Sequence, residues 1–405
     1  MIPKAVILAV AKEESLQVTT IEKDYVLGWM LHGIAAHPRL SCWVFKGGTC
    51  LKKCFFETYR FSEDLDFTVP AGESLATNAI DVALREVCDW VTAASGIEFP
   101  GDGMSVEEYT NKQGTASFQA KVTYIGPLAL PRRTLQRIKF DITQHESLVD
   151  PPDLRRIFHR YADAPESAAT IACYSVNEIL AEKTRALYER QGRARDVYDV
   201  VHISRSFRGD VSPERARDVL ARKFEFKALP APSVDGILAR IDNDSLRVNW
   251  DQQLAHQLPA LPPIDRFLID LRDSLTWWME PSRAPAGPAR LPATEGVLVT
   301  PQRFPVATPT GLLRARGTPT VEQVLERVRF AARNRLCIEL TYDGVRRLAE
   351  PYSLRRSTQG NLLLYVHELT RQGRPTDQTK RYNVARLRDV VVGAQPFDAR
   401  WAVEL

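Results

Sequence analysis

This 405-residue chain contains no apolar run long enough to cross a membrane, since a membrane-spanning helix needs about 20 consecutive apolar residues. Its first residues also lack the charged and then apolar order of a secretory signal. Hydrophobic residues make up 44% of the chain, which is ordinary for a globular protein with a proper core. We therefore expect a cytoplasmic protein that has no contact with the membrane.

Paired cysteines and clustered histidines are missing as well. The six cysteines include no CxxC pair, although Cys50 and Cys54 stand four residues apart, and the seven histidines show no ligand-like spacing. These patterns disfavour a zinc site and a disulfide framework. We expect reduced thiols that fill small spaces in the core.

Net charge is low, at +4, but it is unevenly placed. Residues 319–405 hold 15 Lys and Arg against 10 Asp and Glu, which gives +5, and residues 281–318 hold five Arg and one Glu, which gives +4. The remainder, residues 1–280, is therefore −5. A basic C-terminal part beside an acidic N-terminal part indicates either nucleic-acid contact at the C-terminal end or pairing between the two parts; two independently solvated surfaces are the alternative.

Periodicity divides the chain into four parts. Residues 19–22, TTIE, read as a capping box that opens a helix to about His32. We predict an α/β core over residues 1–165, with a small mixed sheet and flanking helices, and a helical part over residues 166–280. The expected strands are Trp43–Phe45, Phe118–Ile125 and Arg137–Thr143, and the expected helices are Leu75–Ala94, Val176–Arg190, Arg195–Phe207, 214–224 and 263–279.

Residues 281–318 contain seven prolines, a composition that buries little apolar surface, and we interpret them as a linker with a possible short strand at Gly296–Thr300. Residues 319–405 follow as a second compact unit. One amphipathic helix, Val321–Arg335, precedes short strands, which predicts a small β-barrel. The expected strands are Cys337–Tyr342, Leu362–His367 and Val390–Val392.

The most informative segment is residues 45–67, FKGGTCLKKCFFETYRFSEDLDF. An apolar strand runs into Gly47-Gly48, a short helix follows, and a second strand carries Asp64 and Asp66. Residues i and i+2 of a strand point to the same face. Two carboxylates on one face, opposite a glycine turn that lets backbone N–H groups approach an anion, suit Mg²⁺ and nucleotide phosphates. A solvated strand edge is the alternative for an isolated DxD.

Three further positions extend this candidate site. Asp141 lies on an alternating strand and could complete a two-metal site, or it could serve a turn. Lys183 rises from an apolar helix face, so it either reaches a buried anion or extends its ammonium to solvent. Asp196 and Asp199 are one helical turn apart, where they could orient Lys183, activate an acceptor or form surface ion pairs with nearby arginines. Ser62 would face the same way as Asp64 if the strand has begun there, and a turn serine is equally compatible.

These residues resemble the motifs of the nucleotidyltransferase-like toxins of the AbiEii/AbiGii group, which include the mycobacterial MenT toxins. The first motif of that family, hG[GS] followed by Dh[DE]h, is matched by Gly47, Gly48, Asp64 and Asp66, with Lys46 directly before the glycines. The resemblance runs over roughly residues 15 to 275. Its looser matches are the E-K-D run Glu22-Lys23-Asp24, Asp141, Lys183 and the run from Arg195 through Asp196 to Asp199.

The resemblance implies a set of roles. Asp64, Asp66 and Asp141 would bind Mg²⁺ (or Mn²⁺), and the same three with Lys183 and Asp196 would be catalytic. The NTP substrate would contact Lys46, Gly47, Gly48, Ser62 and Lys183.

The C-terminal unit resembles a WYL domain, a ligand-sensing fold with an Sm-like barrel. The matching segments are IELTYDG, Glu350-Pro351-Tyr352 and GNLLLYVHE, but the namesake Trp-Tyr-Leu triplet is Leu364-Tyr365-Val366 here, so the Trp is lost. We expect Tyr365 and His367, which alternate on one strand, to offer one face to a ligand, and the late arginines to grip an anion or nucleic acid. The expected ligand residues are Tyr365, His367, Arg381 and Arg386.

These expectations combine into one function. The resemblance implies a toxin of a bacterial toxin–antitoxin or phage-defence system that transfers NMP from NTP to an acceptor, with tRNA favoured, under control of the WYL-like unit and of a cognate antitoxin. One alternative is a synthase of oligonucleotide or nucleotide signals. The other is an inactive transferase fold that acts as a sensor.

Overall fold

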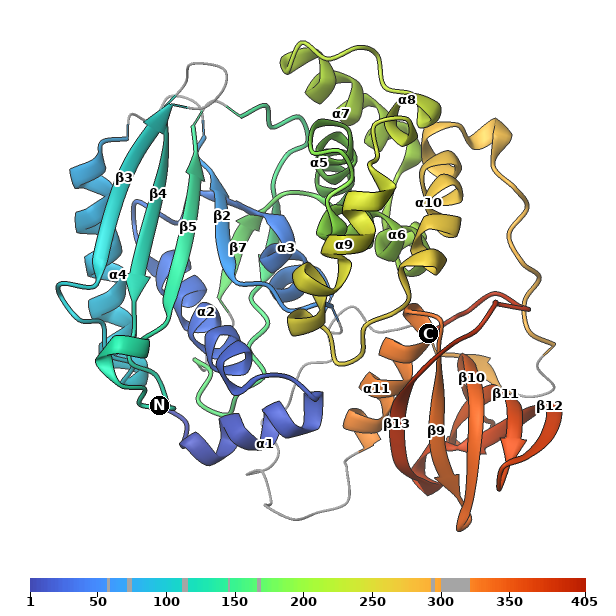
Figure 1. Ribbon diagram of the computed structural model, residues 1–405. Coiled ribbons are helices and arrows are strands. Elements are labelled where there is room, and N and C mark those ends of the chain that lie inside the picture. Colours follow the sequence, from blue (N-terminus) through green and yellow to red (C-terminus); the bar gives the residue numbers. More distant parts are fainter. Residues whose placement is uncertain are drawn as a thin grey trace.

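The computed structural model describes residues 1–56, 59–70, 75–110, 116–144, 146–165, 169–292, 296–299 and 321–405. A mixed sheet with flanking helices is followed by a group of helices and then by a separate antiparallel sheet (Figure 1). This architecture confirms the expected α/β part and the small β unit. Residues 293–295 and 300–318 of the expected linker lie outside the described residues, and the four domain limits stay predictions.

Seven strands form the first sheet, in the order β3-β4-β5-β2-β1-β7-β6. Strand β2 pairs with β5 in parallel and with β1 antiparallel, so the DxD strand lies between the glycine turn and the strand of Asp141. The strands are β1 (Val44–Lys46), β2 (Asp64–Thr68), β3 (Met104–Thr110), β4 (Ala116–Thr123), β5 (Arg137–Thr143), β6 (Asp153–Arg156) and β7 (Thr170–Cys173).

Helices α2 (Val18–Ala36) and α4 (Thr77–Ser95) lie on one side of this sheet, and α1 (Lys4–Glu14) packs against α2. Figure 1 shows α2 and α4 behind β3, β4 and β5. Strand β5 alternates accordingly, because Ile138, Phe140 and Ile142 are fully buried while Arg137 and Lys139 are exposed. The polar face of the sheet is therefore the one turned away from α2 and α4.

The predicted capping box is wrong. Helix α2 begins at Val18, and its N-cap residue, Gln17, makes no side-chain hydrogen bond to the first turn. The Glu22 carboxylate instead accepts a hydrogen bond of 2.6 Å from the backbone N–H of Leu128. The Glu22 side chain thus binds a residue far away in the sequence instead of the N-terminus of its own helix.

The helical part follows β7 directly. Ser175 caps the first of its helices by accepting a hydrogen bond from the N–H of Glu178, and Ser212 caps another that has Pro213 in its first turn. These helices pack against one another beside the mixed sheet (Figure 1). They are α5 (Val176–Glu189), α6 (Ala194–Ser206), α7 (Pro213–Phe226), α8 (Val234–Leu238), α9 (Asn243–Leu254) and α10 (Ile264–Met279).

The C-terminal unit is an antiparallel sheet in the order β12-β11-β10-β9-β13, with β8 paired to β10. The hairpin between β9 and β10 turns at Asp343-Gly344, both with positive φ, as tight two-residue turns require. The expected strand at Gly296–Thr300 is shorter, at Val297–Leu298. The elements are β8 (Val297–Leu298), α11 (Val321–Arg333), β9 (Leu336–Tyr342), β10 (Val345–Arg356), β11 (Leu362–Arg371), β12 (Arg374–Asn383) and β13 (Leu387–Pro396).

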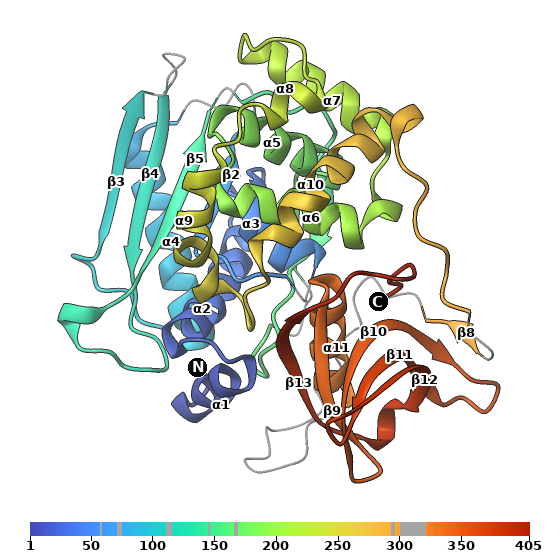
Figure 2. The same ribbon diagram turned by 45° about the vertical axis from the view of Figure 1, so that its right-hand side comes forward.

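Helix α11 joins the two parts. It packs on its own sheet and on α6, and both views place it between the C-terminal sheet and the rest of the chain (Figures 1 and 2). The Tyr198 hydroxyl donates a hydrogen bond of 3.0 Å to Oδ1 of Asn334, and the Arg333 guanidinium lies over the ring of Phe207. The buried apolar residues of both parts form one continuous cluster. The two parts therefore share one apolar core, although a proline-rich segment separates them in the sequence.

Candidate active site

The glycine turn lies directly against the DxD strand. Gly47 has φ 79°, a conformation that side chains other than glycine rarely adopt, and a Cβ added there would stand 2.0 Å from Oδ2 of Asp66. A Cβ on Gly48 would stand 2.6 Å from a guanidinium nitrogen of Arg60. Helix α3 (Gly47–Cys50) starts at this turn, where the first backbone N–H groups have no partner within the helix. Hydrogen-bond donors thus lie beside a carboxylate because neither position carries a side chain.

The three predicted carboxylates lie on one face of adjacent strands. In the parallel pair β2–β5, Asp66 is opposite Asp141 and Asp64 is opposite Lys139. Gln119 on β4 donates a hydrogen bond of 3.2 Å to Oδ1 of Asp141. Asp64, Asp66 and Asp141 are all partly exposed, so the edge that they form is open to a ligand.

Electrostatics at this edge favour a cation. Burial, followed by the charge of Asp141, raises the pKa of Asp66 from 3.8 to about 7, although Lys46 opposes the shift. Burial also raises the pKa of Asp64, against the opposing charge of Lys139. These carboxylates repel one another, and a hard divalent cation with oxygen ligands would relieve that repulsion. The donor set therefore fits Mg²⁺.

The carboxylates are spaced more widely than the ligands of a single-ion cage. Among the residues that the structure describes, the only group of three or more potential ligands whose atoms all lie within 4.8 Å of one another is Cys50, Cys54 and Cys173. A pair of ions about 3.5–4 Å apart is held by a wider set of oxygens. The three thiols are buried and free, as expected for core cysteines, but their convergence from α3, the following π-helical turn Leu51–Phe55 and β7 was not visible in the sequence.

Lys183 is held by two carboxylates of α6. Its Nζ lies 3.0 Å from Oδ1 of Asp196 and 2.9 Å from Oδ2 of Asp199. Burial lowers the pKa of Lys183, but Asp199 and Asp196 outweigh it, so the pKa is raised and the ammonium stays charged. Its charge also acts on Asp66. The two aspartates thus fix a cation close to the carboxylate edge.

Asp199 has further partners that sequence reasoning missed. Arg60 binds it in a bidentate pair of 2.7 and 2.8 Å, and the Tyr59 hydroxyl donates to the same carboxylate. Burial alone would raise the pKa of Asp199, but Arg60 and Lys183 hold it far below its ordinary value. Ser62 lies before β2 begins, and its Oγ would be 3.2 Å from a Cβ on Gly48. This buried ion cluster fastens the segment ahead of the DxD strand to α6.

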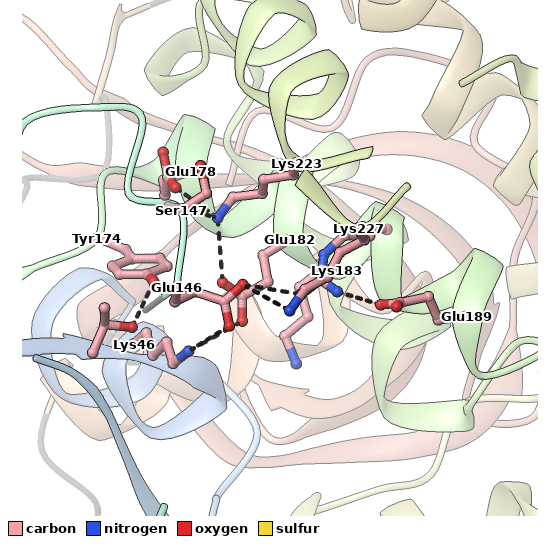
Figure 3. A network of polar contacts seen from close by, with 12 residues as sticks. Lys46, Glu146, Ser147, Tyr174, Glu178, Glu182, Lys183, Glu189, Lys223 and Lys227 are labelled. Atoms are coloured by element: carbon pink, nitrogen blue, oxygen red, sulfur yellow. Dashed lines mark hydrogen bonds and ion pairs between the residues drawn. The ribbon is translucent and has the colours of Figure 1, made fainter. Parts of the chain in front are cut away.

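Lys46 extends into a network of acidic and basic side chains beside the edge (Figure 3). Its Nζ lies 3.8 Å from Glu146 and 3.9 Å from Glu182, distances that permit ion pairing without a hydrogen bond. Burial lowers the pKa of Lys46, but these carboxylates outweigh it and raise the pKa above its ordinary value. Lys223 in turn lies 2.6 Å from Glu178 and 3.7 Å from Glu182. Lys46, which was predicted to contact the nucleotide, therefore already lies near two carboxylates, those of Glu146 and Glu182, without a hydrogen bond to either.

The E-K-D run on α2 fixes three separate segments. Glu22 binds the N–H of Leu128, as described above. Lys23 lies 3.1 Å from Glu63, directly before Asp64, and Asp24 lies 2.8 Å from Lys53 in the π-helical turn after α3. Consecutive helix residues point in different directions, so one run of three can position the glycine helix and the DxD strand together.

The ligand residues expected in the C-terminal unit do not share one open face. Tyr365 and His367 are only 3% and 5% exposed, since Tyr365 packs in a cluster with Phe397 and the His367 ring lies 5.6 Å from that of Trp401. Arg381 is opposite Tyr365 on β12, but Arg386 pairs with Asp343 at the β9–β10 hairpin. The prediction that Tyr365 and His367 offer an exposed face is wrong, because residues 397–401 pack against it. The ligand-binding roles expected for Arg381 and Arg386 stay predictions.

Comparisons with known proteins bear on this geometry. The family model described as "Nucleotidyl transferase AbiEii toxin, Type IV TA system" matches residues 29–279, more than half of the chain. No curated protein matches the chain. Among solved structures, MenT4, a nucleotidyltransferase toxin from Mycobacterium tuberculosis H37Rv, is similar, with 20% identity and a TM-score of 0.44 over 69% of this chain and 90% of that one.

A carboxylate edge beside a glycine turn on a mixed sheet indicates a nucleotidyltransferase. The chain belongs to the AbiEii nucleotidyltransferase toxin family, which confirms the resemblance expected over roughly residues 15 to 275. The family match ends at residue 279, so the likeness of residues 319–405 to a WYL domain stays a prediction. No helix in the described part of the chain is both long and apolar enough to span a membrane.

Proposed function

We propose that this toxin transfers a nucleoside monophosphate from a nucleoside triphosphate to the end of an RNA, with tRNA as the acceptor and Mg²⁺ (or Mn²⁺) as the metal. The observation that carries the proposal is the register of β2 and β5, which sets Asp66 opposite Asp141 beside Gly47. In the reaction, the acceptor hydroxyl oxygen bonds to the α-phosphorus, the bond to the β-phosphate breaks, and pyrophosphate leaves. Phosphate transfer of this kind depends mainly on positioning and charge.

The chain divides this work among its elements. The turn at Gly47 and Gly48 lets the triphosphate approach backbone N–H groups, with the Ser62 hydroxyl beside it. Lys183, fixed by Asp196 and Asp199, offsets phosphate charge. Lys46 does the same when its ammonium moves away from Glu146 and Glu182 toward the phosphates.

Asp64, Asp66 and Asp141 would hold the Mg²⁺, which when bound neutralises charge on the phosphates and makes the acceptor oxygen more reactive. The proton of the acceptor hydroxyl passes to the carboxylate of Asp141, which lies on the open side of the edge next to Gln119.

We further propose that the C-terminal unit regulates this site through an anionic ligand or nucleic acid. Asn334, directly after α11, binds the hydroxyl of Tyr198, and Tyr198 precedes Asp199 on α6. A ligand that shifts α11 would therefore act on the residue that holds Lys183 and Arg60. The proposed domains are 1–165, 166–280, 281–318 and 319–405, and Arg381 and Arg386 are the proposed ligand contacts that Phe397 and Trp401 leave uncovered.

The test is to incubate the pure protein with each labelled NTP and total RNA, with and without Mg²⁺. We expect labelled tRNA from the native protein and from Asp89→Ala, which removes an exposed carboxylate on α4 behind the sheet, and none from Asp66→Ala. Labelled short products without RNA would instead show a signal synthase. NTP binding without any turnover would show a sensor.

Cellular behaviour provides a second test, because the family description names type IV toxin–antitoxin systems. Expression of the chain should slow bacterial growth, a cognate antitoxin encoded beside it should restore growth, and a role in phage defence would appear as reduced phage yield. Normal growth at high levels of folded protein would contradict the toxin assignment.

A further inference from the structure

Two lysines stand directly opposite one another on the polar face of the mixed sheet. Lys121 on β4 pairs with Lys139 on the antiparallel strand β5. Like charges in this position destabilise a sheet. Glu107 lies 3.7 Å from Lys121, whereas within the described part of the chain no carboxylate lies within ion-pairing distance of Lys139. The pairing of Lys121 with Lys139 therefore does not stabilise the sheet.

The positive charge continues along β5. Arg137 lies two residues before Lys139 and therefore on the same face, and Arg132 and Arg133 are exposed in the short turn just upstream. Among the described residues, none of these three arginines has an ion-pair partner, whereas some exposed arginines, such as Arg85 with Asp81, have one. We call this set the basic stripe; it consists of Lys121, Arg132, Arg133, Arg137 and Lys139.

The basic stripe leads to the carboxylate edge. Along β5 the outward residues are Arg137, Lys139 and Asp141, each about 6.8 Å from the next, and Lys139 is opposite Asp64 on β2. On the same face, Tyr109 of β3 is 43% exposed. Figure 1 shows the helices α2 and α4 behind these strands, and this side of β3, β4 and β5 carries no described helix.

A polar cavity lies at the start of β5. Its volume is about 530 Å³, and its lining includes Arg137 of the basic stripe with Lys23, Glu63 and His256. Glu63 directly precedes Asp64, so the cavity adjoins the carboxylate edge. Sites for small organic ligands commonly measure about 300–1,000 Å³, which makes this one large enough for a nucleotide.

We propose that the open face of β3, β4 and β5 is the seat of the RNA acceptor, with the basic stripe on its phosphates, one base in the cavity beside Glu63, and its terminal hydroxyl at the carboxylate edge. The inference rests on the proposed function and adds where the acceptor lies. A single-stranded end fits best, because an unstacked base can enter a cavity while its backbone follows a line of cations.

The first test removes two cations of the basic stripe, Arg137→Ala with Lys139→Ala. RNA affinity, measured without NTP at two salt concentrations, should fall at least tenfold. The salt slope should shrink by about 1.4, since each phosphate contact in a single strand contributes about 0.7. The KM for NTP should change less than the RNA affinity, because neither side chain is a proposed metal or NTP contact. The matched control, Arg85→Ala with Arg222→Ala, removes the same charge on α4 and α7 and should bind RNA like the native protein.

The outcomes separate the inference from the proposed function. Native protein that labels RNA while the double variant retains full RNA affinity overturns the inference and leaves the function intact. Native protein that labels no RNA contradicts the function, yet a loss of RNA binding in the double variant would still support this face as an RNA surface. Native protein that binds no RNA overturns the inference.

A second variant, Lys139→Glu, separates binding from folding. It converts the like-charged pair with Lys121 into an opposite-charged one but sets a carboxylate opposite Asp64, so the two effects should largely offset each other in the melting temperature. RNA affinity should fall further than in Lys139→Ala, because a carboxylate then faces the phosphates. A lower melting temperature together with native RNA affinity would overturn the proposal.

Discussion

Asp66 on β2 lies directly opposite Asp141 on the parallel strand β5, and at this edge the pKa of Asp66 is raised to about 7. The two strands come from separate regions of the chain, and their register alone brings these carboxylates together. These carboxylates repel one another, so we expect the stability of the folded protein to depend on pH and on a divalent cation.

The first prediction concerns that dependence. Asp66 titrates near 3.8 in the unfolded chain and near 7 in the folded protein. Between these values the folded state binds the additional proton, so the free energy of unfolding falls as the pH rises from about 4 to about 7. Mg²⁺ binding offsets this loss, by about 2.7 kcal/mol at 100 times its Kd. Melting with Mg²⁺ should therefore show a larger upward shift at pH 7.5 than at pH 5.

Asp66→Asn is the control for this measurement. It removes the charge that both the pH effect and the metal require, so neither shift should remain. An equal response to Mg²⁺ in this variant would show that the metal binds elsewhere.

The second prediction concerns the glycine turn. Gly47→Ala places a Cβ 2.0 Å from Oδ2 of Asp66 at a φ of 79°, so the carboxylate or the turn must move. A displacement of about 1 Å at a reacting centre costs about 100-fold in rate, and turnover should fall by at least that factor. Gly101→Ala is the matched control, because a Cβ there meets nothing within 4 Å. Similar activity in the two variants would mean that the turn is only structural.

The third prediction concerns the ion cluster on α6. Asp199 is fully buried between Arg60, Lys183 and Tyr59. Asp199→Ala should lower the free energy of unfolding by about 3–5 kcal/mol, because it leaves the buried guanidinium of Arg60 without its carboxylate partner. Tyr59→Phe removes one hydrogen bond and should cost only about 1 kcal/mol. Chemical denaturation of the two variants measures the difference, and equal losses would contradict this account.

Lys183 itself separates binding from stability. Lys183→Ala should raise the KM for NTP and lower kcat, since the ammonium offsets triphosphate charge, while Lys183→Arg should retain part of the activity. Steady-state kinetics at saturating acceptor measure both values. A change confined to melting would make Lys183 a structural cation of the cluster.

The fourth prediction concerns the contact between the two parts of the chain. Tyr198→Phe removes the hydrogen bond to Asn334 and should cost about 1 kcal/mol. If the C-terminal unit regulates the site through this contact, the activity should no longer respond to an RNA or nucleotide that binds residues 319–405. Tyr188→Phe is the control, because Tyr188 packs against Phe224 on α7, away from α11. Equal responses in both variants would exclude this route.

Local patterns were sufficient for the core of the site. The alternation of β5 and the run from Val44 through the glycines to Asp66 are short-range features, and both appear in the structure with limits close to those predicted. Strands β3, β6 and β7 were not predicted. Strands β6 and β7 are only four residues long and β3 is mostly exposed, so their pairing, not their composition, makes them strands.

Long-range contacts account for the other differences. The sequence offers no sign that Arg60 reaches Asp199 or that Cys173 meets Cys50, because these pairs depend on how α6 and β7 pack. The same holds for Glu22, whose carboxylate serves Leu128 instead of its own helix, and for Tyr365, which residues near Trp401 cover. A local sequence pattern predicts contacts with neighbours in the sequence, whereas the partners of these side chains come from distant segments that packing brings together.

The order of the strands has a consequence for biosynthesis. The proposed site draws on Gly47 from the start of α3, Asp141 from β5, and Lys183 and Asp199 from two later helices. A ribosome must therefore make about 200 residues before these groups can meet, which takes about 10–40 s at 5–20 residues per second. During that interval each new chain is still bound to the ribosome and has no complete candidate site, so it cannot act on the RNAs of the ribosome that makes it.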